Sequence, residues 1–152
     1  MNKIKVLYID DEQHNLAAFK SNFRKDFEVF TAESASVGFE ILKSERISVL
    51  LSDQRMPKMT GVDFFEQVKE IYPNIVRILV TGYTDMEALV KAVNKAQIYK
   101  YINKPWDNEK LKEIINKAHE LFELRSAEIL EKEELETVNS QLEFMLRQKL
   151  LS

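Results

Sequence analysis

Five short apolar runs alternate with amphipathic segments through the first 117 or so residues, and this alternation restricts the fold more than any other feature. Between the runs, apolar side chains recur at helical spacing, as Leu16, Phe19 and Phe23 do after the first run. Alternating strands and helices form parallel sheets, and nearly continuous apolar strands are typical of a sheet covered on both faces. The sequence therefore predicts an α/β protein with a doubly wound five-stranded parallel sheet. Its strands are expected at about residues 4–9, 27–31, 47–52, 75–80 and 98–102.

Polar residues mark where the predicted helices begin. Ser34, Thr60, Thr84 and Asp107 each precede an amphipathic segment and carry an oxygen that can cap a helix. Right-handed crossovers leave only a few strand orders. In the flavodoxin-like order 2-1-3-4-5, the first and third strands are neighbours at the point where the winding reverses. Ligands bind beyond the carboxyl ends of the strands at such a point, so we expect the functional site there.

Ionisable and polar residues stand at the carboxyl ends of four of the runs. The first run ends in Asp10 and Asp11, the third in Asp53, the fourth in Thr81, and the fifth is followed by Lys104. The predicted topology brings all five to one crevice. Three carboxylates repel each other unless a cation lies among them, and oxygen ligands without His or Cys suit Mg²⁺. A carboxylate can also be the nucleophile of phosphoryl transfer, with Mg²⁺ and the lysine ammonium stabilising the transferred charge.

Residues 1–122 resemble a CheY-like receiver domain of the two-component response-regulator family. The resemblance rests on residues that follow the family's order and spacing: Asp10-Asp11, Asp53, Met56-Pro57, Thr81, Tyr101 and Lys104-Pro105. It implies that Asp53 accepts a phosphoryl group from a phosphohistidine on a sensor histidine kinase or a phosphotransfer protein. It also implies a signalling domain that catalyses only its own phosphorylation and dephosphorylation.

The resemblance assigns roles to the remaining site residues. Asp10, Asp11, Asp53 and the backbone carbonyl of Arg55 would hold Mg²⁺. Lys104 would contact the phosphoryl group. Thr81 and Tyr101 would form the switch pair, in which the hydroxyl moves towards the phosphoryl group and the aromatic ring follows inward.

Two stretches point to particular members of the family. Residues 52–57 and 97–106 resemble receivers joined to cyclic-dinucleotide phosphodiesterases or to hydrogenase-linked transcription regulators. Arg55 is a long cation at a position whose side chain overhangs the site, so we expect it to alter autodephosphorylation. Lys58 stands where a glycine is common in the family.

The sequence changes character after Lys117. Residues 118–152 contain no Gly and no Pro. We expect one helix from about Asp107 to about Leu150, with residues 123–152 forming a linker that pairs as a two-stranded coiled coil in a homodimer. The alternative is a solvated, partly frayed tail, because Glu128 and Glu131 interrupt the seam. The seam with three-four spacing consists of Leu121, Leu124, Leu135, Val138, Leu142 and Met145.

The composition argues against several classes of protein. There is no cysteine, so disulfides and thiolate metal sites are excluded. No apolar stretch approaches the roughly 18 residues that cross a bilayer, and the first ten residues lack the organisation of a signal peptide. The net charge of -3 argues mildly against direct nucleic-acid contact. We expect a soluble cytoplasmic protein without membrane contact, with His14 and His119 at its surface.

Two other functions stay open. A hydrolase that forms an aspartyl phosphate would need a lid over the site, whereas the loops here are short. Arg55 also occupies the position where such an enzyme would carry a second acid. A dimerisation or scaffold module with a vestigial pocket would fail to bind Mg²⁺ at millimolar concentration. The 152 residues contain no pattern of an output domain, so we expect either a receiver whose output domain lies outside this sequence or a stand-alone receiver.

Overall fold

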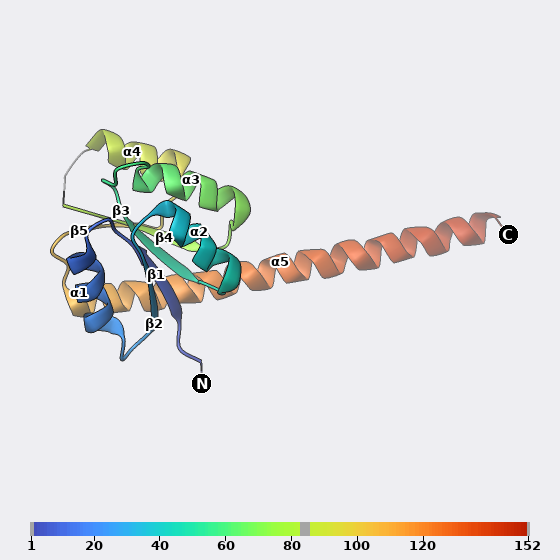
Figure 1. Ribbon diagram of the computed structural model, residues 1–152. Helices are drawn as coiled ribbons and strands as arrows, with labels where there is room; N and C mark the ends of the chain where they lie inside the picture. Colours follow the sequence, from blue (N-terminus) through green and yellow to red (C-terminus); the bar gives the residue numbers. More distant parts are fainter. Residues whose placement is uncertain (1, 83–85, 152) are drawn as a thin grey trace. The chain divides into compact units, whose positions relative to one another are not determined.

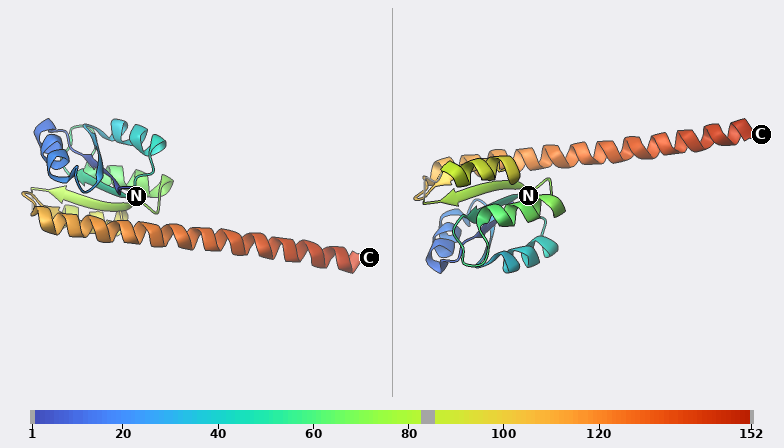
Figure 2. Two further views of the ribbon diagram at one scale, coloured as in Figure 1. Left: turned by 90° about the horizontal axis from the view of Figure 1, so that it is seen from below. Right: turned by 90° about the horizontal axis from the view of Figure 1, so that it is seen from above.

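The computed structural model describes residues 2–82 and 86–151, and the chain divides into two compact units, Met1–Phe122 and Glu123–Ser152. The first unit is a five-stranded parallel sheet with helices on both sides (Figures 1 and 2). Its strand order is β2-β1-β3-β4-β5, which confirms the predicted flavodoxin-like arrangement. The strands are β1 (Lys5–Ile9), β2 (Glu28–Ala32), β3 (Val49–Asp53), β4 (Val76–Thr81) and β5 (Lys100–Asn103). The helices are α1 (Gln13–Phe23), α2 (Ala35–Ser44), α3 (Gly61–Ile71), α4 (Met86–Lys95) and α5 (Asn108–Leu151).

The predicted caps begin three of the helices. Ser34 Oγ accepts a hydrogen bond from the Val37 amide at 3.3 Å, and Thr60 Oγ1 accepts one from Asp63 at 3.1 Å. Asp107 accepts one from the Lys110 amide at 3.1 Å. Each bond satisfies an amide that has no partner within its helix. Thr84, the remaining predicted cap, lies outside the described residues.

The central strands carry the core. Every residue of β3 and β4 is buried, as expected for strands covered on both faces. β4 nevertheless contains an arginine, Arg77, which is 2% exposed. Its guanidinium donates to the backbone carbonyls of Ala96 at 3.0 Å, Ile75 at 2.8 Å and Gln97 at 3.2 Å. The three bonds compensate the burial of the charge, and those to Ala96 and Gln97 hold the segment between α4 and β5 against the sheet.

The surface prediction for His119 is wrong. His14 is exposed, with 78% of its side chain accessible, but His119 is half-buried on α5, and its Nδ1 lies 2.9 Å from Ser48 Oγ. The His119 ring also stacks on Phe122, with 6.3 Å between centroids. The Arg46 guanidinium lies 4.8 Å above the same Phe122 ring. Ser48 is buried just before β3, and its hydroxyl has two polar partners, the Lys5 carbonyl at 3.4 Å and His119, which lies 71 positions later.

The second unit has a different surface. It consists of about the last two-thirds of α5, and every described residue from 127 onward is exposed. The exposed apolar side chains include Leu135, Val138, Leu142 and Met145 of the predicted seam, each 49–64% exposed. Over the described part of the chain, no helix has a stretch apolar and long enough to cross a membrane.

Candidate functional site

The predicted acids meet beyond the carboxyl ends of two neighbouring strands. β1 and β3 pair with Ile9 opposite Ser52, so Asp10 and Asp53 leave the sheet side by side. One carboxylate oxygen from each of Asp10, Asp11 and Asp53 lies within 4.8 Å of the others. Asp10 is fully buried, Asp53 is 9% exposed and Asp11 is exposed. The cluster therefore has a buried floor and one accessible side.

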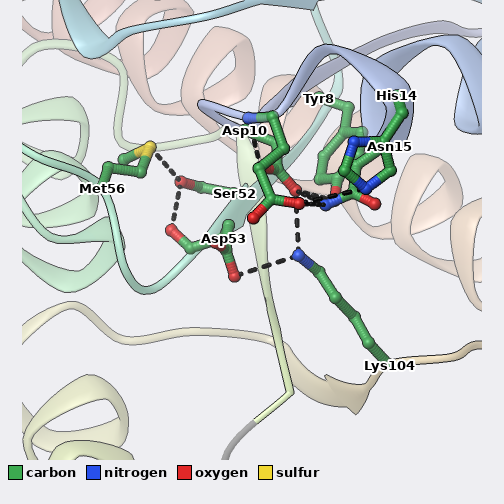
Figure 3. Close-up of polar contacts among 9 residues, drawn as sticks. Tyr8, Asp10, His14, Asn15, Ser52, Asp53, Met56 and Lys104 are labelled. Carbon is green, nitrogen blue, oxygen red and sulfur yellow. Dashed lines mark hydrogen bonds and ion pairs between the residues drawn. The ribbon is translucent and has the colours of Figure 1, made fainter.

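Lys104 joins this cluster from the end of β5. Its Nζ lies 2.9 Å from Asp10 Oδ2 and 3.3 Å from Asp53 Oδ1 (Figure 3). Its backbone amide donates to the Thr81 carbonyl at 3.0 Å, which ties the residue to the end of β4. The Lys104–Pro105 peptide bond is cis. One ammonium thus faces two carboxylates that come from different strands.

Asp10 has further partners that the sequence did not single out. Its Oδ2 accepts from the Tyr8 hydroxyl at 2.7 Å and from Asn15 Nδ2 at 3.0 Å. Its Oδ1 accepts from the Glu12 amide at 3.0 Å. Figure 3 shows Tyr8, Asn15 and Lys104 converging on the same carboxylate. One signal was available, because residues two apart in a strand share a face, which places Tyr8 on the side of Asp10.

The electrostatics separate the two buried acids. Burial acts to raise the pKa of Asp10, but hydrogen bonds from Tyr8, Glu12 and Lys104 outweigh it, and the pKa lies below its ordinary value. Burial raises the pKa of Asp53; Lys104 lowers it, the Asp10 charge raises it again, and the net shift is upward. Burial acts to lower the pKa of Lys104, but the two carboxylates outweigh it and the net shift is upward. Asp53 is therefore the carboxylate whose charge is least compensated.

The loop after β3 packs closely on the backbone of Asp53. A Cβ at Gly61 would overlap the Asp53 carbonyl oxygen, so only glycine fits at the start of α3. The Gly61 amide donates to the Gln54 carbonyl at 3.0 Å, and the Gln54 side chain accepts from the Val62 amide at 3.0 Å. Ser52 Oγ donates to the Asp53 carbonyl at 2.9 Å. These contacts fix the direction in which Asp53 leaves the sheet, and neither Gly61 nor Gln54 was predicted as a site residue.

Thr81, Tyr101 and Arg55, the other predicted site residues, are not among the residues that form the acid cluster. Thr81 is 4% exposed at the end of β4, and Tyr101 is half-buried on β5. The two strands pair Thr81 with Asn103, and the Tyr101 hydroxyl donates to Asn103 Oδ1 at 2.5 Å. Arg55 is exposed in the loop that follows Asp53.

The donor set fits Mg²⁺. Three carboxylates within 4.8 Å of one another supply only oxygen, which this hard cation prefers, and one side of the cluster is accessible for the waters that it retains. The same cluster holds an ammonium between Asp10 and Asp53, so it already accommodates positive charge. Asp10, Asp11 and Asp53 are the side chains that would hold the ion.

Comparisons with known proteins agree on one family. The family model for the response regulator receiver domain matches residues 6–116. The hydrogenase transcriptional regulatory protein HoxA of Cupriavidus necator is 43% identical over 115 residues, which cover 76% of this chain and 24% of that protein. This similarity agrees with the resemblance of residues 52–57 and 97–106 to hydrogenase-linked regulators. The chain spans about a quarter of the length of the curated relatives that it matches first.

Solved structures lead to the same fold. The signal receiver domain of an HD domain-containing protein from Pseudomonas fluorescens Pf-5 superposes with a TM-score of 0.79 at 25% identity, covering 84% of this chain and 94% of that one. The beryllofluoride-activated NtrC4 receiver domain dimer superposes with a TM-score of 0.72 at 28% identity, covering 78% and 98%.

Proposed function

The chain belongs to the response regulator receiver family, and from this premise we propose that Asp53 is the phosphoacceptor of a two-component phosphorelay. The donor would be a phosphohistidine of a sensor histidine kinase or a phosphotransfer protein, and the proposed location is the cytoplasm, where such kinases draw on ATP. The observation that carries the proposal is the convergence of Asp10, Asp11, Asp53 and Lys104 from three strand ends. Receiver domains are signalling domains, and we propose no substrate turnover beyond this transfer and its reversal.

The proposed step is a displacement at phosphorus. A carboxylate oxygen of Asp53 forms a bond to phosphorus while the bond from phosphorus to the imidazole nitrogen breaks. The electron pair of that bond stays on the imidazole nitrogen. A ring that carried a proton on its other nitrogen leaves as neutral imidazole, and a ring that did not takes a proton from water. Asp53 is suited to this role because neighbouring groups stabilise its negative charge less than they stabilise that of Asp10, which leaves Asp53 the better nucleophile of the two. Lys104, 3.3 Å from Asp53 Oδ1, is within reach of an oxygen on the transferred group.

A divalent ion belongs to the proposal. We propose that Asp10, Asp11, Asp53 and the backbone carbonyl of Arg55 hold Mg²⁺, which when bound neutralises charge on the phosphoryl oxygens. The protein's own contribution is to hold the three carboxylates within 4.8 Å of each other at the end of a rigid sheet. Support comes from the oxygen-only donor set.

Phosphorylation of Asp53 would change the conformation of a pair of residues, Thr81 and Tyr101. We propose that Thr81 moves towards the phosphoryl group and that Tyr101 follows into the space it leaves. Support comes from the hydroxyl of Tyr101, which binds Asn103, the residue that pairs with Thr81 across the two strands. Such a pair is a bistable element of the kind a phosphorylation switch requires.

The output would pass through the second unit. We propose that residues 123–152 form a helical linker that pairs as a coiled coil in a homodimer and carries the switch to an output domain outside this chain. Support comes from the exposed seam of Leu135, Val138, Leu142 and Met145, which only another surface can bury. Removing the chain from Ile129 onward should lower the dimer fraction in sedimentation equilibrium, and a wild type that remains monomeric at high concentration would contradict the pairing.

The phosphoacceptor is tested by labelling. Acetyl phosphate with Mg²⁺ should add one phosphoryl group to the wild type and none to Asp53→Ala, as measured by intact-protein mass. Asp63→Ala is the matched control, because Asp63 is an exposed acid in the first turn of α3 that is not one of the three clustered acids. Equal labelling of the wild type and Asp53→Ala would contradict the assignment of Asp53 as the phosphoacceptor. Turnover of a small phosphoester by the wild type would favour a hydrolase instead.

A further inference from the structure

We propose that Tyr8 is a positioning residue for the cation site, whose hydroxyl turns the Asp10 carboxylate so that Oδ1 is the atom that meets the cation. This inference rests on the proposed function, because it takes the acid cluster to bind Mg²⁺. No role for Tyr8 follows from the resemblance that assigned the other site residues. It follows from the contacts of one buried side chain.

The hydrogen bonds of Asp10 are distributed unequally between its two oxygens. Oδ2 accepts from three donors, the Tyr8 hydroxyl at 2.7 Å, Lys104 Nζ at 2.9 Å and Asn15 Nδ2 at 3.0 Å. A carboxylate oxygen has about two lone-pair sites, so Oδ2 is saturated by these described residues. Oδ1 accepts from the Glu12 amide at 3.0 Å and keeps capacity for one more partner. The oxygen with room for a cation is therefore Oδ1.

Tyr8 is the most firmly held of the three side chains that donate to Oδ2. Its side chain is fully buried in β1, and its ring packs against Phe19 at 4.7 Å and edge-on against Trp106 at 6.0 Å between centroids. Lys104 divides its ammonium between Asp10 and Asp53, and Asn15 divides its amide between Asp10 and Glu12. A buried ring with only two side-chain torsions can hold a carboxylate in one orientation more strictly than either of these.

The arrangement also allows Lys104 to leave Asp10. If Lys104 turns towards a phosphoryl oxygen, Asp10 Oδ2 loses one donor but keeps the Tyr8 hydroxyl and the Asn15 amide. If Lys104 were the sole donor to Oδ2, its departure would leave a buried charged oxygen without a hydrogen bond, which is costly. The Tyr8 and Asn15 donors avoid this cost. Tyr8 would therefore both orient Asp10 and make the lysine available.

The test removes the hydroxyl and nothing else. Tyr8→Phe keeps the ring that packs on Phe19 and Trp106, and Mg²⁺ binding is measured by calorimetry and by the fluorescence of Trp106, the sole tryptophan. Loss of an outer partner of a metal ligand costs about 10–100-fold in affinity, so the dissociation constant should rise by at least about tenfold. Tyr72→Phe is the matched control, because Tyr72 follows α3 at the end remote from the acids.

The outcomes separate this inference from the proposed function. Weaker Mg²⁺ binding by Tyr8→Phe, with Tyr72→Phe unchanged, supports the positioning role. Equal binding by wild type and Tyr8→Phe overturns the inference and leaves the proposed function intact. Failure of the wild type itself to bind Mg²⁺ overturns both. A lower unfolding temperature of Tyr8→Phe without a change in Mg²⁺ affinity would mark a purely structural role and also overturns the inference.

Discussion

The two units of this chain bury their apolar side chains in different ways. In Met1–Phe122, aromatic residues such as Phe19, Phe64 and Phe65 are fully buried among strands and helices of the same unit. In Glu123–Ser152, apolar side chains such as Leu135 and Leu142 stay 64% and 52% exposed. Burial of apolar surface is the main favourable contribution to folding. The first unit therefore buries a core of its own, whereas the described part of the second leaves its apolar side chains exposed, which is the basis of the proposed pairing.

The largest difference should appear in unfolding. Phe65→Ala removes a fully buried ring from the first unit and should lower the free energy of unfolding by about 3–5 kcal/mol. Leu142→Ala should leave the unfolding of the first unit within about 0.5 kcal/mol of the wild type, because Leu142 is exposed. Urea denaturation at low protein concentration measures both. A comparable loss from Leu142→Ala would show that the second unit contributes to the first unit's stability.

For dimer association, we expect the larger effect from a substitution in the second unit. Leu142→Lys places a charge in the proposed seam of both copies and removes two leucines that each contribute about 1.5–3 kcal/mol when buried. The dimer dissociation constant should rise by about 100-fold or more in sedimentation equilibrium. Ser140→Lys, two residues earlier and off the seam, is the control and should change it little. Equal effects of the two lysines would show that charge, and not the seam, controls association.

The sheet edge offers a smaller, local test inside the first unit. Gly61→Ala introduces a Cβ that overlaps the Asp53 carbonyl oxygen, and overpacking of this kind costs about 1–3 kcal/mol. Gly82→Ala is its control, because a Cβ there meets no atom within 4 Å. Thermal unfolding should separate the two variants. Equal midpoints would mean that the loop after β3 relaxes around the added methyl group without a loss of stability.

The smallest expected effect is a pH dependence of Mg²⁺ binding. The pKa of Asp53 is raised by burial, while hydrogen bonds to Asp10 outweigh its burial and lower its pKa. As the pH falls, Asp53 takes up a proton before Asp10 does, and the protonated acid no longer binds the cation. Mg²⁺ affinity should therefore fall more steeply in the wild type than in Asp53→Asn, as followed by calorimetry at stepwise lower pH. Parallel curves would assign the titration to another group.

Asp10 and Asp53 affect the pH dependence of folding stability in opposite directions. Its pKa in the folded chain is lowered, so the stabilisation it contributes is present above its unfolded pKa and is lost as the pH falls through the folded value. Asp53, with a raised pKa, opposes folding when it is charged and ceases to do so once protonated. The two acids thus partly cancel in the stability of the ion-free protein.

The fold and the acids were accessible from the sequence for one physical reason. Asp10, Asp53 and Lys104 each stand at the carboxyl end of an apolar run, and in a parallel sheet these ends lie at the same edge. The local pattern therefore predicted that these three side chains, which are distant in the sequence, lie close together. The caps at Ser34 and Thr60 were equally accessible, because capping depends on neighbouring residues alone.

The contacts that could not be predicted from the sequence are those that no local pattern determines by itself. His119 and Ser48 meet across 71 positions, and nothing near either residue indicates the other. The spacing of Tyr8 and Asp10 places them on one side of the strand, but it does not indicate that the Tyr8 hydroxyl lies 2.7 Å from the Asp10 carboxylate. Gly61 is required by a close approach of two backbone segments, which only coordinates reveal.

The most direct test asks which atom carries the phosphoryl group. The wild type is incubated with acetyl phosphate and Mg²⁺ and then treated with borohydride, which reduces an aspartyl phosphate to homoserine, and the peptides are sequenced by mass spectrometry. The proposed function predicts homoserine at position 53 and unmodified aspartate at positions 10 and 11. Reduction at Asp10 or Asp11 instead, or no reduction anywhere, would contradict it.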